Sequence, residues 1–238
     1  GGFYSGSFAV GQHVGAPSLR HRGIRRLDSV VLSHPHPDHF KGLSFVISHF
    51  PTKQFWSPQV STSDPDFADL MNRLAQKKVV CLGPQELPPR QDINGVVVEV
   101  LHPPPDFHPG HTIPTNRELN NLSFVVRLSY KEVSFLFPGD IEKEVEYRLA
   151  NQRLYEPVDV LLVPHHGSRT SSSLPFLHWL QPQIAVFSVG FDNPFHLPAR
   201  RVVERYRTLG ARTYRTDHHG AVTILTDGHT IEVETFLD

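Results

Sequence analysis

The sequence predicts a layered α/β fold. Short runs of β-branched and aliphatic residues, such as residues 29–32, alternate along the chain with stretches of helical apolar spacing, such as residues 40–50. This alternation is typical of sheets covered by helices. No internal repeat, linker or low-complexity segment interrupts the 238 residues. We therefore expect one α/β domain over residues 1–238.

The elements follow from local patterns. Pro65 in a first turn opens a predicted helix, and Lys131 separates two alternating strands as a tight hairpin. Residues 106–118 are polar and rich in proline, which predicts a loop. The predicted helices are residues 16–23, 40–50, 64–78, 141–150, 174–180 and 199–209. The predicted strands are residues 29–32, 54–56, 79–82, 96–101, 122–130, 132–137, 158–163, 184–189, 212–214, 221–225 and 230–234.

Composition excludes several classes of protein. The net charge of −1 offers no general attraction to nucleic acid, so any basic surface must be local, in residues 20–26 or in the helix at 199–209. A single cysteine, Cys81, excludes an internal disulfide, and its apolar neighbours predict a buried side chain. No apolar run approaches the ~20 residues of a membrane span, and no signal peptide is recognisable.

One short stretch concentrates metal-ligand residue types. His34, His36, Asp38 and His39 lie within six residues, directly after a predicted buried strand. The prolines at 35 and 37 are expected to prevent a regular helix there and to keep the chain extended or turned. Imidazole and carboxylate groups that converge at a strand exit suit a borderline divalent metal, Zn²⁺ foremost. Four such residues are more than one open catalytic ion needs, so the stretch predicts two metals.

Other predicted strands also end in ligand-type residues. Asp140 follows a Pro-Gly turn after a hairpin strand, and its two oxygens could bridge two ions. His165 and His166 follow the strand at 158–163, and His196 follows the strand at 184–189. Polar residues at strand exits are how a rigid sheet presents a site at its edge.

These motifs occur in an order that resembles a known family. His34-Pro-His36-Pro-Asp38-His39 is similar to the HxHxDH signature of the metallo-β-lactamase superfamily. With Asn120-Asn-Leu-Ser, Pro-Gly-Asp140, Pro-His165-His166-Gly-Ser168 and Asn-Pro-Phe-His196, the chain resembles the metallo-β-lactamase-like domain of the ComEC-type DNA-internalisation competence proteins. The resemblance covers nearly the whole chain.

The resemblance implies a fold and a biological setting. The fold is a four-layer αββα sandwich, and we expect this chain to start after the family's first strands, which leaves a truncated and marginally stable domain. The family's domain is attached to a polytopic membrane protein, on the extracytoplasmic side of the bacterial inner membrane. Its implied activity is that of a nuclease that degrades the DNA strand that is not imported during natural transformation. We predict single-stranded DNA as the substrate and no stable oligomer.

The ligands can be assigned on this basis. We expect two divalent ions, Zn²⁺ or Mn²⁺, one bound by His34 and His36 and the other by Asp38, His39 and His196, with Asp140 as bridge. The third ligand of the first ion stays open among His165, His102, His111 and Asn120.

We also expect catalytic and substrate-binding roles. Asp38 could orient the bridging hydroxide, and His165 or His166 could contact a phosphate oxygen or protonate the leaving group. Because adjacent residues of an extended chain point to opposite sides, only one of these two histidines should face the metals, with His165 slightly favoured. Asn120 and Ser168 are candidate substrate contacts, and Ser168 could instead cap the helix that follows.

Two other functions are compatible with the sequence. The chain could hydrolyse a smaller ester, such as a phosphocholine-type phosphodiester, a lactam or a thioester, since the superfamily includes all of these. It could also be a DNA-binding module with an inactive site, although the complete set of ligand residues argues against this reading. A local basic groove would favour a nuclease over the small-ester hydrolase.

Overall fold

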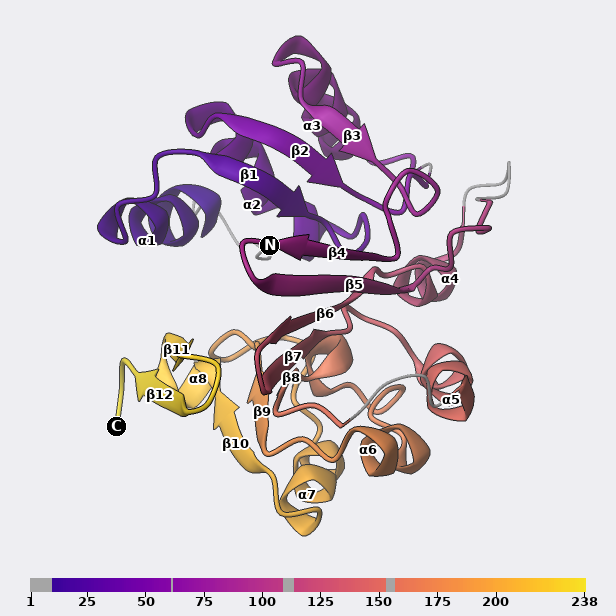
Figure 1. The fold of residues 1–238 in the computed structure, drawn as a ribbon, viewed down its shortest axis with the longest axis vertical. Helices are drawn as coiled ribbons and strands as arrows, with labels where there is room; N and C mark the ends of the chain where they lie inside the picture. Colours follow the sequence, from indigo (N-terminus) through magenta and orange to yellow (C-terminus); the bar gives the residue numbers. More distant parts are fainter. Residues whose placement is uncertain (1–9, 61, 109–113, 153–156) are drawn as a thin grey trace. The chain divides into compact units, whose positions relative to one another are not determined.

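The computed structural model describes residues 10–60, 62–108, 114–152 and 157–238. It has an α/β fold in which helices pack on mixed sheets, as predicted (Figure 1). The chain divides into two compact units. Unit 1 is Gly1–Leu87 with Pro103–Phe124, and unit 2 is Pro88–His102 with Val125–Asp238. That the whole chain forms one domain stays a prediction.

Unit 1 is built on a parallel three-stranded sheet in the order β1-β2-β3. Its strands are β1 (Leu27–Val31), β2 (Thr52–Trp56) and β3 (Val80–Leu82). Its helices are η1 (Gly11–Gly15), α1 (Ala16–His21), α2 (Pro37–His49), α3 (Pro65–Gln76) and α4 (Asn116–Asn121). Parallel neighbours need crossover connections, and α2 and α3 supply them.

Apolar faces of α2 and α3 form the core of unit 1 with the sheet. Phe40 and Ile47 of α2 and Leu70 of α3 are fully buried against Phe55 of β2. Asp64 caps α3, because its side chain accepts the backbone N–H of Asp66 at 2.8 Å. Cys81 is only partly buried at the edge of this core, which corrects the predicted burial.

Two further predictions for unit 1 were wrong. The prolines do not prevent a helix after β1, because Pro37 occupies the first position of α2, where its missing N–H costs nothing. Asp38 and His39 therefore lie in the first turn of a helix. Within the predicted loop at 106–118, α4 begins at Asn116, since Thr115 and Glu118 form a capping box.

Unit 2 contains a mixed seven-stranded sheet and a separate hairpin. The order of the large sheet is β10-β9-β8-β7-β6-β5-β4, and β11 pairs with β12. The strands are β4 (Arg90–Ile93), β5 (Val96–His102), β6 (Val125–Tyr130), β7 (Val133–Phe137), β8 (Val160–Leu162), β9 (Ile184–Phe187), β10 (Arg212–Arg215), β11 (Val222–Thr226) and β12 (Ile231–Thr235). The helices are α5 (Lys143–Gln152), η2 (Pro164–Gly167), α6 (Leu174–Leu180), α7 (Arg200–Thr208) and α8 (Thr216–His219).

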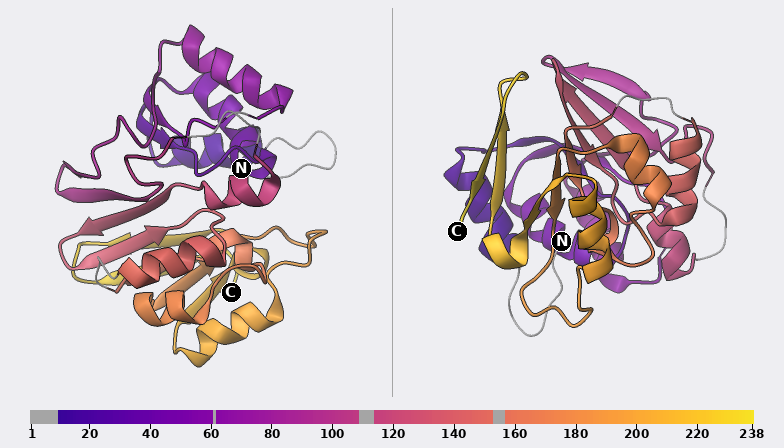
Figure 2. Two further views of the ribbon diagram at one scale, coloured as in Figure 1. Left: turned by 90° about the vertical axis from the view of Figure 1, so that its right-hand side faces the viewer. Right: turned by 90° about the horizontal axis from the view of Figure 1, so that it is seen from below.

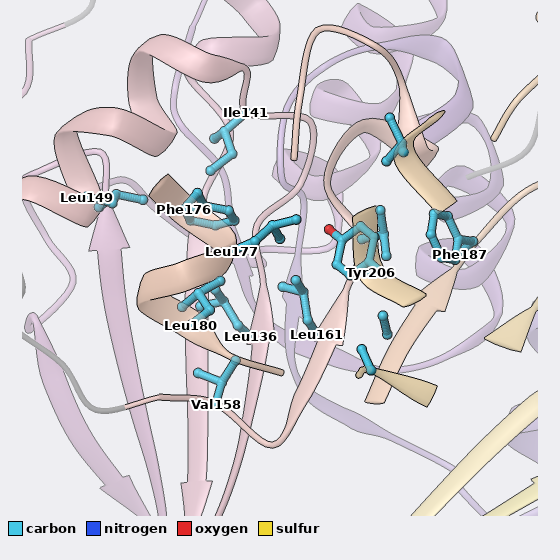
Figure 3. Close-up of a cluster of buried hydrophobic side chains, with 14 of the residues drawn as sticks. Leu136, Ile141, Leu149, Val158, Leu161, Phe176, Leu177, Leu180, Phe187 and Tyr206 are labelled. Carbon is cyan, nitrogen blue, oxygen red and sulfur yellow. The ribbon is translucent and has the colours of Figure 1, made fainter. Parts of the chain in front are cut away.

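The two faces of this sheet are covered differently. The helices α5, α6 and α7 lie on one face of the sheet (Figure 2). On that face Leu136 and Leu161 pack with Phe176, Leu177 and Tyr206 (Figure 3). The alternate strand residues face the β11–β12 hairpin, whose apolar side chains cover them. This alternation is the period of two that strands impose. The sheet is thus held rigidly between a helical layer and a hairpin.

Sequence patterns placed most strands of unit 2 within two residues of their bounds. The strand β4 was missed, because Arg90–Ile93 is mostly polar and exposed and pairs only as an edge next to β5. The short α8 was missed as well, since its four residues are too few to show a period. No helix in the described parts of the chain has the length and apolar character to cross a bilayer.

Candidate metal-binding residues

The histidine cluster of unit 1 lies where β1 gives way to α2. His34 follows the strand and is fully buried, and His36 is the N-cap residue of α2. Asp38 and His39 occupy the first turn of that helix, both partly exposed. A helix N-terminus favours the ionised form of a carboxylate, which is the form that binds metals.

Nitrogen and oxygen atoms of this cluster lie close together. His34 Nε2 is 2.9 Å from His36 Nδ1, and the ring centroids of His34 and His39 are 4.2 Å apart. His39 Nε2 is 3.5 Å from Asp38 Oδ2. Imidazole nitrogens at this separation can both reach one ion at the Zn–N distance of about 2.0–2.1 Å. The structure therefore brings together the four residues predicted from the signature.

Two serines orient the imidazoles. Ser33 Oγ lies 3.2 Å from His34 Nδ1 and 3.0 Å from His39 Nδ1, and Ser123 Oγ lies 3.1 Å from His34 Nδ1. A hydroxyl at Nδ1 fixes the orientation of the ring, as the outer partner of a metal-ligating histidine does. The sequence analysis did not assign these roles. Ser33 could have been found from its place beside the motif, whereas Ser123 is distant in the sequence and had no local signal.

Two other candidates belong to unit 1. Asn120, a predicted substrate contact, is buried in α4, three residues before Ser123. His111, a candidate third ligand, lies outside the described residues.

In unit 2, Asp140 lies in the turn after β7 and is 4% exposed. Gly139 has a φ of 59°, a left-handed conformation that glycine adopts without strain. The carbonyl oxygen of Gly139 accepts the backbone N–H of His165 at 3.1 Å. This bond fixes the Asp140 turn against the histidine turn.

His165 and His166 do not point to opposite sides as predicted. They belong to the 3₁₀ turn η2 and have φ values of 49° and 54°, so the rule for extended strands does not apply. Both rings reach the same carboxylate, because His165 Nε2 is 3.9 Å and His166 Nε2 is 3.7 Å from Asp140 Oδ2. A division of roles between the two histidines stays a prediction.

The remaining ring nitrogens distinguish the two histidines. His166 Nδ1 lies 2.7 Å from the carbonyl oxygen of Ser188, which makes Nδ1 the donor of that bond, and Nε2 is the ring nitrogen on the side of Asp140. His165 Nδ1 contacts the Thr170 hydroxyl at 3.2 Å and lies 3.7 Å from Glu142 Oε1. The backbone-anchored His166 thus has the arrangement of a metal ligand, a role for which it was not predicted.

Ser168 and His196 lie on one side of this unit. Ser168 does not cap the next helix, since α6 starts six residues later, and its Oγ contacts Thr170 Oγ1 at 3.1 Å. His196 is exposed in the segment between β9 and α7, where it lines a pocket of about 340 Å³ with Ser168. Among described residues, no carboxylate forms an ion pair with His196. Its assignment as a ligand stays a prediction.

His102 is the remaining candidate ligand of unit 2. It ends β5 and is 4% exposed.

The donor sets suit divalent ions. In unit 1, three histidines and one aspartate gather nitrogen and oxygen donors where β1 gives way to α2. In unit 2, a buried aspartate lies between two imidazoles. Histidine with carboxylate is the donor chemistry of Zn²⁺, Mn²⁺ and iron rather than of Ca²⁺ or Mg²⁺.

Comparison with known proteins identifies the family. The profile of the Metallo-beta-lactamase superfamily matches residues 3–190. The chain is 29% identical over 215 residues to ComE operon protein 3 of Bacillus subtilis, covering 90% of this chain and 26% of that protein. It is 31% identical over 223 residues to Competence protein ComA of Neisseria gonorrhoeae, covering 92% of this chain and 28% of that protein. The chain thus spans about a quarter of the length of these relatives.

Solved structures agree on the fold. Igni18, a metallo hydrolase from Ignicoccus hospitalis, aligns with a TM-score of 0.50 and 15% identity over 88% of this chain and 80% of its own. CmlA, a diiron beta-hydroxylase from Streptomyces venezuelae, aligns with a TM-score of 0.51 and 16% identity over 80% of this chain and 44% of its own. With the profile match and the relatives, this agreement leads to one conclusion: the chain belongs to the metallo-beta-lactamase superfamily, and relatives such as ComE operon protein 3 and Competence protein ComA are ComEC-type competence proteins.

Proposed function

We propose that this chain is a metal-dependent phosphodiesterase that cleaves single-stranded DNA during DNA uptake. The observation that carries the hydrolase assignment is the ordered histidine cluster of unit 1. There, His34 and His36 present nitrogens 2.9 Å apart, and serine hydroxyls hold His34 and His39 at Nδ1. Such orientation before metal binding is what a catalytic centre needs.

The proposed ligands follow the superfamily signature. His34 and His36 would hold one ion, and Asp38, His39 and His196 the other, with Asp140 as bridge. His166 adds a ligand candidate that its bond to Ser188 supports. Bound divalent ions supply a water of lowered pKa and positive charge for phosphate oxygens. Asp38 would orient the attacking water, and His165, whose Nδ1 contacts the Thr170 hydroxyl, would donate a proton to the leaving oxygen.

DNA as the substrate is supported by the relatives. One of them is named Competence protein ComA, another is ComE operon protein 3, and a third, 27% identical over 208 residues, is Recombination protein 2 of Haemophilus influenzae. A domain of a longer membrane protein, acting on the extracytoplasmic side and degrading the strand that is not imported, is consistent with a chain that covers about a quarter of such relatives.

The test is a digestion series. The chain should cut single-stranded oligonucleotides when Mn²⁺ or Zn²⁺ is added and lose this activity with a chelator. Bis(p-nitrophenyl) phosphate, a thioester and a β-lactam serve as competing small substrates. If one of these small substrates is turned over while the DNA stays uncut, the chain is assigned to small-ester hydrolysis. If neither the DNA nor any of the small substrates is turned over, the hydrolase assignment is contradicted.

Asp140 provides the matching variant. Asp140→Asn keeps the shape of the side chain but removes the charge from a residue that is 4% exposed. We expect metal affinity to fall by more than about a hundredfold, since residues that only orient ligands are worth about 10- to 100-fold. Metal content and circular dichroism of the purified variant measure this. Asp69→Asn, at an exposed ion pair with Arg73 on α3, is the control. Full metal content and activity in Asp140→Asn would disprove the ligand assignment.

A further inference from the structure

We propose that the segment between β9 and α7, residues 188–199, is a base-stacking platform that binds single-stranded nucleic acid through Phe191 and Phe195. This inference rests on the proposed function and names a part of its substrate site. Phe191 is 87% exposed and Phe195 is 61% exposed. Folding usually gains free energy by burying aromatic rings. Two exposed aromatic rings on one short segment therefore point to a ligand that covers them.

The segment is rigid at its centre. The Asn193 side chain donates to the carbonyl oxygens of Gly190 at 3.0 Å and Leu197 at 2.7 Å, and it accepts the N–H of Leu197 at 2.9 Å. These three bonds close the tip on which both phenylalanines lie. A platform that is already ordered loses little entropy when it binds.

Both ends of the segment are tied to the histidine turn. At one end, His166 Nδ1 bonds the carbonyl oxygen of Ser188 at 2.7 Å. At the other end, the N–H of Ala199 bonds the carbonyl oxygen of Gly167 at 3.0 Å. The backbone of the segment is therefore tied at both ends to the turn of His165 and His166, which the proposed mechanism uses.

A pocket joins the aromatic ring to phosphate-binding groups. Phe195 and His196 line it together with Ser168 and Arg169. A guanidinium and a hydroxyl are donors that suit a phosphate, while the phenylalanine ring offers a face to a base. Stacking on aromatic rings is tolerant of sequence because every base has a π-face. The groups that line the pocket thus suit one nucleotide of a single strand, with its phosphate and its base.

The charge of the surroundings supports this ligand. Arg169 is exposed, and Arg200 and Arg201 follow the segment directly, whereas Asp192 is its single acidic residue. Arg200 forms an ion pair with Glu204, with Arg200 Nε 2.8 Å from Glu204 Oε1. The local balance is positive on a chain whose net charge is −1, which meets the requirement for a local basic surface.

The experiment compares a strand that has bases with one that has none. An oligothymidylate of about twelve nucleotides, within the range of single-strand sites, is made with phosphorothioate linkages and labelled for anisotropy with the metal-loaded chain. An abasic strand of equal length and charge is the second probe. We expect Phe195→Leu and Phe191→Leu each to weaken oligothymidylate binding by about tenfold and to leave abasic binding unchanged.

Phe236→Leu is the matched control, because Phe236 is 80% exposed elsewhere in unit 2 and should change neither affinity. Equal losses on both strands, or no loss on either, would overturn the proposal. So would a loss confined to phosphatidylglycerol vesicles, which would make the segment a membrane contact. The nuclease proposal is judged separately by cleavage of phosphodiester strands. If the chain does not cleave DNA but the phenylalanine variants lose affinity for oligothymidylate alone, only the nuclease activity is refuted. If the chain cleaves DNA but the variants do not show this selective loss, only the stacking platform is refuted.

Discussion

At the scale of single residues, Gly167 determines the geometry of the histidine turn. Its φ is 79°, and a Cβ there would lie 2.7 Å from Pro198 Cβ and 2.9 Å from the Phe187 ring. Glycine is thus required twice, once by the backbone conformation and once by the space. This agrees with the expectation from the sequence that Gly167 permits a turn which other residues resist.

We therefore predict that Gly167→Ala is more destabilising than Gly210→Ala. Gly210 has a φ of 84° but nothing within 4 Å of an added Cβ. Gly210→Ala should therefore lower the free energy of unfolding only by the strain of an alanine in the left-handed conformation, about 1–2 kcal/mol. Overpacking should add about 1–3 kcal/mol at Gly167. Urea unfolding of both variants measures the difference. Equal free energies of unfolding would show that Pro198 and Phe187 move aside without cost.

At the scale of elements, the serines before α6 depend on one buried carboxylate. Glu146 of α5 is fully buried and accepts the N–H groups of Ser172 at 2.5 Å and Ser173 at 2.7 Å. Ser172 Oγ also contacts Tyr206 Oη at 2.9 Å. This network joins α5, α6 and α7 behind the turn that carries Ser168 and Thr170. Burial raises the pKa of Glu146 above its ordinary 4.5, although the N–H donors lower it.

A pH dependence of stability follows. Because the pKa of Glu146 is raised in the native state, the native protein keeps this proton over a range where the unfolded chain has lost it. The resulting stability is complete below the ordinary value of 4.5 and is lost as the pH rises through the native pKa. We expect Glu146→Gln to remove the loss of stability that the native protein shows as the pH rises through the pKa of Glu146. Urea midpoints from weakly acidic to neutral pH measure it, with exposed Glu144→Gln as control. Parallel pH curves for native protein and Glu146→Gln would contradict the prediction.

At the scale of the whole molecule, the chain order interleaves the two units. The chain enters unit 2 at Pro88–His102, returns to unit 1 for Pro103–Phe124, and enters unit 2 again at Val125. The strand β5 from the first segment pairs along the full length of β6 from the second. The large sheet therefore cannot be completed by the residues after Val125 alone.

We predict that a fragment of residues 125–238 aggregates, whereas residues 88–238 stay monomeric and fold. Without β5, the N–H and C=O groups of β6 form an open edge, which promotes association between chains. Size-exclusion chromatography and circular dichroism of both fragments measure this. A monomeric, folded fragment of residues 125–238 would show that β4 and β5 are dispensable for the sheet.

The sequence by itself determined the α/β class, most element positions and the ligand candidates, because these depend on local patterns. A short β-branched run specifies β1 and helical spacing specifies α3, and the spacing of His34, His36, Asp38 and His39 is itself the signature. A short polar edge such as β4 has no local apolar pattern, so only its pairing with β5 in the folded chain revealed it.

Only the tertiary structure decided how the side chains are oriented. Ser123 reaches His34 from 89 positions away, and no local pattern encodes such a contact. The left-handed conformation of His165 and His166 arises because the turn is fixed by Gly139 and Ser188, whereas sequence reasoning assumed an extended strand exit. Likewise, the side-chain bonds of Asn193 link Gly190 and Leu197, the residues that flank the exposed Phe191 and Phe195. Local propensity selects elements, but contacts between distant residues orient the groups that perform chemistry.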